Sequence, residues 1–513
     1  MTDSVVQTDA KQSDSTGAIL SVQQMQSVDE QTISQGTAGY TLLCNAGAAV
    51  ARQVESVSAA TDRILCVCGF GNNGGDALVA ARLLNTAGYK VTVALCAEPD
   101  RYQGDARRAL TELAIATHPI EKIHISSYNI IVDGLLGAGL NRAVEGRFAD
   151  IIHSINDSAA CVVSIDVPSG IDGNLGQVRG LAIRAESTVT FVRKKPAHVL
   201  YPARANCGQV VLRQIGTADT ALPEDWQRIT ENLPSLWRHT LPRPGWEAHK
   251  YLRGHCAVAS GPLASTGAAR LAATAALRAG AGAVTLCSPE DAMKVNASHL
   301  TAEMLTCTAD APAFASFLKA RRVHSCIVGP GFGLGERVRD FVQVALRDCA
   351  AVVLDADALT AFSDQPATLF RLINQSVAKV VLTPHAGEFD RLFGSANELQ
   401  QCDSADKLQR ARLAAQISQA VVVLKGPDTV IATPEGQCRI NTNATPWLAT
   451  AGSGDVLAGT VGGLLAQGMD AFTAASAGCW LHGEAASSFG PGLIATDIVS
   501  HYPDVLRELL DQR

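Results

Sequence analysis

Short apolar runs alternate with segments of helical spacing along most of the chain. In the first half, the strand-like runs cover residues 63–68, 89–96, 129–137, 160–168, 187–193 and 208–215. Residues 18–56, ahead of them, carry apolar side chains at helical spacing. The runs are apolar at successive positions, which is typical of strands buried on both faces of a parallel sheet. The pattern therefore predicts an α/β domain with a doubly wound parallel sheet.

A second series of the same kind fills the other half of the chain. Its strand-like runs cover residues 254–261, 282–288, 325–333, 350–359, 379–388 and 420–434, and a glycine-rich segment follows at 449–468. Between the two series, residues 217–245 are rich in proline and in polar and charged residues, and we expect a linker there. The sequence thus predicts two domains, at 18–216 and 246–513, after a disordered lead-in at 1–17.

Composition narrows the classes of function. The 513 residues are 47% apolar and only 5% aromatic, which suits close-packed α/β layers. A net charge of −7 argues against nucleic acid as a partner. No long uncharged apolar run is present, so we expect no membrane span, and the start lacks the features of a signal peptide. The fourteen cysteines form no C-x-x-C pair and no zinc spacing, which indicates small buried hydrophobes in a reducing cytoplasm.

The first candidate for chemistry is the loop after the run at 63–68. Residues 69–74 read G-x-G-x-x-G before a helical pattern, as in dinucleotide-binding folds, and Glu98 lies near the end of the next run, where an acid would contact the ribose. This context leaves a nicotinamide-dependent dehydrogenase open. Against it, the loop continues into Gly75 and Asp76, and a carboxylate repels a pyrophosphate.

Two more strand-end loops carry polar residues. Asp133 opens "DGLLGAGLNR" and Asp166 opens "DVPSGIDG". A single aspartate in such a place is often a helix N-cap. Because carboxyl ends of parallel strands meet at one edge, the oxygens of Asn73, Asp133 and Ser169 would suit a hard cation. Since "DVPSG" is not G-x-S-x-G, Ser169 is not interpreted as a nucleophile.

At these residues the first half resembles the NAD(P)HX epimerase family, the YjeF N-terminal domain. The resemblance rests on "NNGGDALVAARLL", "VDGLLGAGL", "SIDVPSGID" and "TFVRKKPAHVL", with the preface "QQMQSVDEQTISQG", and covers about 18–216. Ala77 stands where the family pattern has glycine. The resemblance implies a Rossmann-like domain that interconverts the R and S epimers of hydrated NADH and NADPH, with potassium at the site.

The resemblance also implies roles for individual residues. Asn73, Asp133 and Ser169 would ligate potassium. Asp166 would contact the hydrated ring and carry the acid/base chemistry, since inversion at the hydrated carbon needs a proton shuttle. The hydrated cofactor would be held by Asn72, Asn73, Gly74, Gly75, Asp76, Gly137, Ala138, Gly139, Leu140, Asn141, Arg142, Ala143 and Asp166.

In the second half, "TAGSGDVLAG" (450–459) is the strongest signal. A Gly-Ser-Gly turn at a helix start presents backbone N–H groups to an anion, and Asp455 directly follows, placed to take a proton from a hydroxyl. Lys425 and Gly426 follow a strand-like run and suit nucleotide phosphates, and His385 lies in another strand-end loop. An ordinary glycine-rich helix cap is the alternative for this segment.

Together with "STGAARLAATAALRAGAGAVTL", "VGPGFG", "LDADAL", "LTPHAGEF" and "VLKGPDTVIA", this segment is similar to the ribokinase-like, ADP- or ATP-dependent NAD(P)H-hydrate dehydratases over about 246–510. The resemblance implies a hydrate site at Ala268, Gly333, His385 and Asp455. It implies nucleotide binding by Lys425, Gly426, Pro427, Asp428, Thr429 and Gly454, with Mg²⁺. The implied chemistry is phosphorylation of the ring hydroxyl, with Asp455 as base, followed by elimination; ADP is the favoured donor.

Two alternatives stay open. The second domain could be a ribokinase-like kinase for another small molecule, which would release a stable phosphorylated product. The first could be a non-catalytic binding scaffold, because one fold serves many functions. On the favoured interpretation, the first domain supplies the S epimer to the second, and we expect a homo-oligomer in the cytoplasm.

Overall fold

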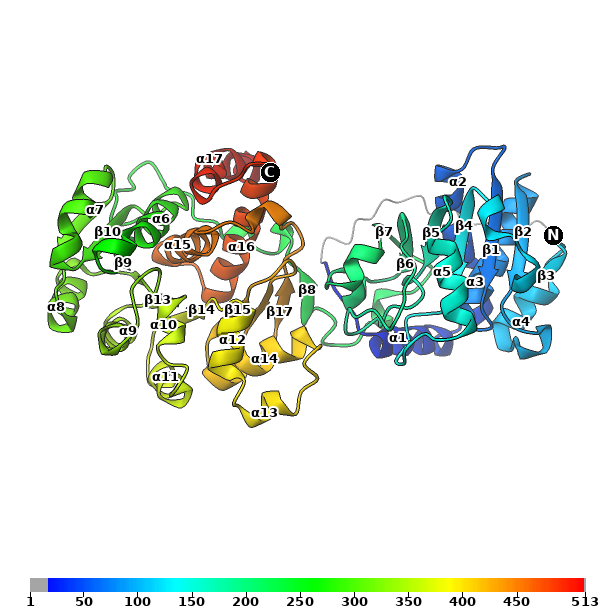
Figure 1. Cartoon of the computed structure of the whole chain (residues 1–513), viewed down its shortest axis with the longest axis horizontal. Helices are drawn as coiled ribbons and strands as arrows, with labels where there is room; N and C mark the ends of the chain where they lie inside the picture. The colour runs from blue at the N-terminus through cyan, green and yellow to red at the C-terminus, as the bar shows by residue number, and fades with distance from the viewer. Residues whose placement is uncertain (1–16, 512–513) are drawn as a thin grey trace. The chain divides into compact units, whose positions relative to one another are not determined.

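The computed structural model describes residues 17–511, so the predicted lead-in lies outside the described residues except for Gly17. The chain divides into two compact units between Gln227 and Arg228. Both units are helix-covered sheets (Figure 1).

The first unit contains a parallel sheet in the order β3-β2-β1-β4-β5-β6-β7. Its strands are β1 (Arg63–Cys68), β2 (Lys90–Leu95), β3 (Thr117–Pro119), β4 (Ile130–Gly134), β5 (Cys161–Ile165), β6 (Ser187–Phe191) and β7 (Gln209–Arg213). Its helices are α1 (Val22–Ser34), α2 (Gly39–Val57), α3 (Asn72–Thr86), α4 (Gly104–Thr111) and α5 (Arg147–Asn156). The predicted Rossmann-like, doubly wound sheet is confirmed, and the strand order reverses between β1 and β4, where such sheets bind ligands.

Alternate side chains of β1 enter two different cores. Ile64 and Cys66 pack with apolar residues of α2, α3 and α4. Leu65 and Val67 pack with isoleucines of α5 on the opposite face. Burial on both faces explains why the run is apolar at successive positions.

The second unit contains a sheet in the order β11-β10-β9-β12-β13-β14-β15-β16-β17-β8. Its strands are β8 (Ile229–Glu231), β9 (His255–Ala259), β10 (Ala283–Ser288), β11 (Met304–Cys307), β12 (Ser325–Val328), β13 (Ala351–Leu354), β14 (Lys379–Leu382), β15 (Val421–Leu424), β16 (Val430–Ala432) and β17 (Cys438–Ile440). The run at 420–434 is two strands and not one: β15, β16 and β17 pair antiparallel. The turn at 425–429 separates β15 from β16, so the ribokinase-like unit ends its parallel sheet in an antiparallel extension.

Helices cover both faces of this second sheet (Figure 1). They are α6 (Thr266–Arg278), α7 (Met293–His299), α8 (Ala311–Arg321), α9 (Glu336–Asp348), α10 (Asp357–Thr360), α11 (Pro366–Asn374), α12 (Ala386–Phe393), α13 (Asn397–Gln400), α14 (Lys407–Ser418), α15 (Ser453–Ala466), α16 (Ala471–Phe489) and α17 (Ala495–Asp511). α15 lies against α6 so closely that a Cβ at Gly459 would be 2.2 Å from the carbonyl oxygen of Ala272. Small residues on both helices permit this approach.

The predicted linker at 217–245 contains the division between the units. After that division, β8 pairs with β17, and Trp237 is fully buried in the core formed with α6, α15 and α16. The Trp237 indole N–H donates to Asn232 Oδ1 at 3.1 Å. This part of the stretch is therefore built into the second unit, which its polar and proline-rich composition did not indicate.

All fourteen cysteines are free thiols. Most are buried, as expected, but Cys307 is exposed and Cys44, Cys161 and Cys402 are half-buried, so burial does not hold for every one. Among the described residues, none of the helices has the length and hydropathy needed to cross a bilayer.

Candidate active sites

The first site begins where β1 ends. After Gly69–Gly71 the chain enters α3 at Asn72, so the residues predicted as a loop, Asn72 to Asp76, form the first turns of a helix. A Cβ at Gly74 would lie 1.8 Å from the carbonyl oxygen of Gly69, so this turn requires glycine there. The start of α3 therefore lies at the carboxyl edge of the sheet, where its free N–H groups favour an anion.

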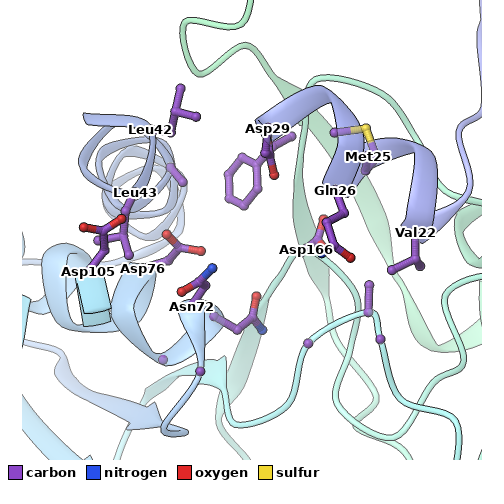
Figure 2. A pocket seen from close by; sticks show the side chains of 18 of the residues that line it. Val22, Met25, Gln26, Asp29, Leu42, Leu43, Asn72, Asp76, Asp105 and Asp166 are labelled. Carbon is purple, nitrogen blue, oxygen red and sulfur yellow. The ribbon is translucent and has the colours of Figure 1, made fainter. Parts of the chain in front are cut away.

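A cavity of about 500 Å³ opens over this edge, a size that fits a small-molecule site. Figure 2 shows Asn72 and Asp76 on one side of it and Asp29 and Asp166 on the other. The predicted substrate-binding residues that line the cavity are Asn72, Asn73, Gly74, Asp76, Gly137, Ala138, Gly139 and Asp166.

The other five predicted substrate-binding residues are not brought to this cavity. Gly75 faces α2, where a Cβ would lie 2.8 Å from Leu43 Cδ1, so its role here is helix packing. Leu140 is half-buried against the apolar core under α5. The three that follow are exposed: Asn141, Arg142 and Ala143.

The three predicted potassium ligands converge below the cavity. The Ser169 hydroxyl donates to Asp133 Oδ1 at 2.6 Å and accepts from the Leu136 N–H at 2.8 Å. The Asn73 amide nitrogen donates to the carbonyls of Leu136 (2.8 Å) and Ile165 (3.0 Å), which leaves its oxygen for another partner.

This donor set fits a potassium ion. The Asp133 carboxylate is fully buried, and burial raises its pKa against the opposing effect of hydrogen bonds from Ser169, Ser164 and Leu135. Those partners are neutral, so a cation would supply the missing counter-charge. Within residues 17–511, no cluster of three or more His, Cys, Asp and Glu side chains could hold a metal ion. The candidate potassium ligands are instead carboxylate, amide and hydroxyl oxygens.

Asp166 is held in a strained and charged setting. Its φ is +62°, in the left-handed region that non-glycine residues seldom occupy. Its Oδ1 accepts from Lys195 Nζ at 2.6 Å and from Thr190 Oγ1 at 3.0 Å. The His198 Nδ1 accepts from the Lys195 N–H, so Nε2 is the donor to the Asp166 carbonyl at 2.7 Å. Burial, with Lys195 nearby, lowers the pKa of His198 to about 4, so this histidine stays neutral.

Lys195 and Asp29 are among the residues of this cavity that sequence reasoning missed. Burial raises the pKa of Asp29 to about 6 and that of Asp76 well above its ordinary value. Both residues lie inside stretches that carried the family resemblance. The signal available in the sequence was a lysine directly before a mostly apolar run, since residues 196–200 follow Lys195.

The second site gathers around Lys425, just after β15. Its Nζ donates to Asp355 Oδ1 at 2.8 Å and lies 3.9 Å from Glu388 Oε2. A Cβ at Gly454 would be 3.5 Å from the same nitrogen, so the lysine meets the start of α15. Burial alone would lower the pKa of Lys425, but Asp355, Glu388 and Asp455 outweigh it and raise it.

Asp455 lies in the first turn of α15 with an altered acidity. Burial, together with Asp355 and Asp357, raises its pKa to about 7 against the opposing effect of Lys425. A carboxyl group with a pKa near 7 is matched to the transfer of a proton at neutral pH.

The remaining predicted hydrate-site residues lie on α6 and on the loops after β12 and β14. His385 caps α12: its Nδ1 accepts from the N–H groups of Gly387 and Glu388, and its imidazole is largely exposed. The Gly333 N–H donates to Asp357 Oδ2 at 2.8 Å. Ala268 lies on α6 and is close to Gly331. Gly331 belongs to the same glycine-rich loop as Gly333.

The predicted nucleotide loop, residues 425–429, forms the turn between β15 and β16. The Thr429 hydroxyl donates to the Gly426 carbonyl at 2.9 Å, and this hydrogen bond holds the turn. Gly426 and Pro427 are exposed. Asp428 is buried and forms an ion pair with Lys407, so its carboxylate ties the loop to α14.

Sequence reasoning missed Asp355 and Asp357 at this site. Asp355 directly follows β13, the position that drew attention to Asp133 and Asp166, so the same rule would have selected it. Ala356 between them has φ +47°, which turns the two carboxylates toward Lys425 and the Gly333 loop respectively.

Comparisons with known proteins agree on both halves. Residues 39–197 match the family model described as YjeF-related protein N-terminus, and residues 256–498 match the model described as NAD(P)H-hydrate dehydratase. The chain is 36% identical to a bifunctional NAD(P)H-hydrate repair enzyme Nnr of Moorella thermoacetica, over 92% of this chain and 93% of the relative. It is 33% identical to the enzyme of that name from Coxiella burnetii, over 93% and 97%.

A solved structure from Bacillus subtilis, an ADP/ATP-dependent NAD(P)H-hydrate dehydratase co-crystallized with ATP and Mg²⁺, aligns with 54% of this chain and 98% of its own. Its sequence identity is 29% and the TM-score is 0.47.

Proposed function

The chain belongs to the family of bifunctional NAD(P)H-hydrate repair enzymes, and from this premise we propose that it repairs hydrated NADH and NADPH. The first unit interconverts the R and S epimers, and the second returns the S epimer to NAD(P)H. One observation supports this most: each unit has, at the carboxyl ends of its strands, a lysine–aspartate pair beside a carboxyl group whose pKa is raised into the working range.

Epimerisation requires the hydroxyl to leave the ring carbon and return on the other face. The ring nitrogen pushes out the hydroxyl, which takes a proton and departs as water, and an iminium ion remains. A water molecule then adds to the same carbon from the opposite face and loses a proton. Asp166, oriented by Lys195 and Thr190, is the base for that proton.

Potassium would be held by Asn73, Asp133 and Ser169, where it supplies positive charge that balances the buried Asp133 carboxylate. Those side chains join the loops after β1, β4 and β5, the loops that form the floor of the cavity. The start of α3 provides N–H groups for the phosphates of the hydrated cofactor.

In the second unit, the ring hydroxyl attacks the terminal phosphorus of the nucleotide while Asp455 takes its proton. The phosphorus–oxygen bond to the leaving nucleotide breaks, so ADP, the favoured donor, becomes AMP. Lys425 and the N–H groups at the start of α15 stabilise the charge on the transferring group. Mg²⁺ bound with the nucleotide would neutralise phosphate charge. Phosphate then departs with a proton from the neighbouring ring carbon, which restores the dihydronicotinamide.

The test is the absorbance of reduced nicotinamide in a mixture of R and S hydrates with the whole chain, potassium, Mg²⁺ and ADP or ATP. Recovery of the whole mixture at the enzymatic rate is the expected result. Fast recovery of the S fraction alone would contradict the epimerase. No recovery with either nucleotide would contradict the dehydratase and favour a kinase for another alcohol.

A further inference from the structure

Asp29 lies on α1, one of the two helices that line the cavity and precede the sheet in the chain. α1 begins with a capping box between Ser21 and Gln24, and the Val22 N–H donates to Asn174 Oδ1 at 2.8 Å. The Leu20 N–H donates to the carbonyl of Lys194 at 3.0 Å, so the chain entering α1 is tied to the segment that carries Lys195.

One oxygen of the Asp29 carboxyl group, Oδ1, is buried and lacks a hydrogen-bond partner among the described residues. Burial of an unpaired polar atom is costly, and native proteins keep few of them. The group faces the same cavity as Asp166, as Figure 2 shows, so a bound molecule is the available partner.

We propose that Asp29 is the acid that protonates the departing hydroxyl in the epimerisation, while Asp166 accepts the proton of the incoming water. This rests on the proposed function of the first unit. The proton passes from Asp29 to the hydroxyl oxygen, the carbon–oxygen bond breaks with its electron pair leaving on that oxygen, and water departs. After water adds at the other face, Asp166 holds one proton more and Asp29 one fewer, and exchange with solvent restores both.

The charges around Asp29 suit this division of roles. Lys195 contacts Asp166 directly and lowers the pKa of Asp29, while burial, Asp166 and Glu30 raise it. Asp76 on α3 and Asp105 on α4 also line this cavity, and burial, with Asp166 and Asp29, raises the pKa of Asp76. One carboxylate is therefore paired with a cation and the other is kept able to hold its proton, the usual arrangement of an acid beside a base.

The experiment measures R-to-S conversion by the full-length chain without nucleotide, so that only the first unit acts, for wild type, Asp29→Asn and Glu55→Gln. Asparagine keeps the shape but has no acidic proton, and we expect kcat to fall about 100-fold or more, the usual contribution of a general acid, with KM changed less than about threefold. Wild-type kcat should fall as pH rises above about 6, and Asp29→Asn should lose that dependence. Glu55→Gln, an exposed change on α2, should stay close to wild type.

Stability separates an acid from a merely structural residue. At pH 7.5 Asp29→Asn should unfold at the same or a higher temperature than wild type, because a buried carboxylate with an unpaired oxygen is removed. The assignment is overturned by a kcat loss below about tenfold, by a loss in KM alone, by an unchanged pH dependence, or by a lower unfolding temperature. Wild type that converts the epimers no faster than buffer contradicts instead the proposed epimerase itself.

Discussion

Lys195 and Lys425 form matching ion pairs in two unrelated sheets, but the acid beside each pair comes from a different place. Lys195 contacts Asp166 at 2.6 Å in the first unit, and Lys425 contacts Asp355 at 2.8 Å in the second. In the second unit the neighbouring carboxyl group belongs to Asp455, which lies in the first turn of α15 after a glycine turn. In the first it is Asp29, from a helix that precedes the sheet. Both sites therefore have the same set of charged groups, but the carboxyl group beside the ion pair lies on a different kind of segment in each fold.

The two sites also share backbone strain. Asp166 has φ +62°, and Ala356, next to Asp355, has φ +47°. Non-glycine residues keep such conformations only where the surroundings enforce them, and such positions cluster at functional sites. In both units the strain falls at a strand end, where it turns a carboxylate toward a lysine.

Removal of the acid of the second unit should have the largest effect. Asp455→Asn should lower kcat for dehydration of the S epimer about 10²- to 10⁴-fold, because the base for the hydroxyl proton is lost. Epimer interconversion by the same variant should be unchanged. The matched control is Asp390→Asn, an exposed change on α12. A dehydration rate near wild type would show that Asp455 is not the base, so that the second site does not use a carboxyl group beside its lysine–aspartate pair.

Breaking the ion pair of the first unit should cost stability. Lys195 is buried, so Lys195→Met leaves Asp166 without its cation, which costs about 3–5 kcal/mol for a buried pair. Arg507→Met removes the cation from an exposed pair with Asp504 and should cost about 0–1 kcal/mol. Hydrogen exchange of peptides covering β5 and β6, followed against urea concentration, measures the loss of stability caused by Lys195→Met. Equal small losses in both variants would mean that Lys195 serves substrate and not the fold.

Glycine 74 tests the start of α3. Gly74→Ala would bring a methyl group onto the Gly69 carbonyl, and overpacking of this kind costs about 1–3 kcal/mol. Epimerase activity should fall with it, since the helix start would shift. Gly71→Ala meets nothing within 4 Å and should be nearly neutral in thermal unfolding and in rate. If both variants behave alike, the close approach is not what the glycine provides.

The smallest effect is a difference between two pH profiles. Asp455 acts as a base with a pKa of about 7, so dehydration should rise about tenfold per pH unit below 7 and level off above it. The epimerase needs the protonated form of its acid and should fall above about 6. The two rates, measured on one preparation from pH 5 to 9, should therefore move in opposite directions between about pH 6 and pH 7, and only the epimerase should fall above pH 7. Parallel profiles would contradict the assignment of an acid to one site and a base to the other.

The fold could be predicted because buried parallel strands are apolar on both faces. The shortest strands at or next to the sheet edges could not be predicted, because β3, β8, β11 and β17 have three or four residues each, too few for a pattern. Strand-end loops revealed Asp133, Asp166 and Ser169 because topology brings such ends together. Lys195 meets Asp166 only through the tertiary fold. Conversely, Asn141 to Ala143 continue a motif in sequence while the backbone turns away from the cavity.

The pairing of β8 with β17 determines where the two activities can be separated. Any fragment that begins at residue 246, the end of the stretch that looked like a linker, loses an edge strand and Trp237 from the core of the second unit. It would expose the hydrogen-bonding groups of β17 and leave a cavity the size of an indole. A protease or a designed cleavage that is to release an intact dehydratase must therefore cut no later than Arg228, where the chain already belongs to the second sheet.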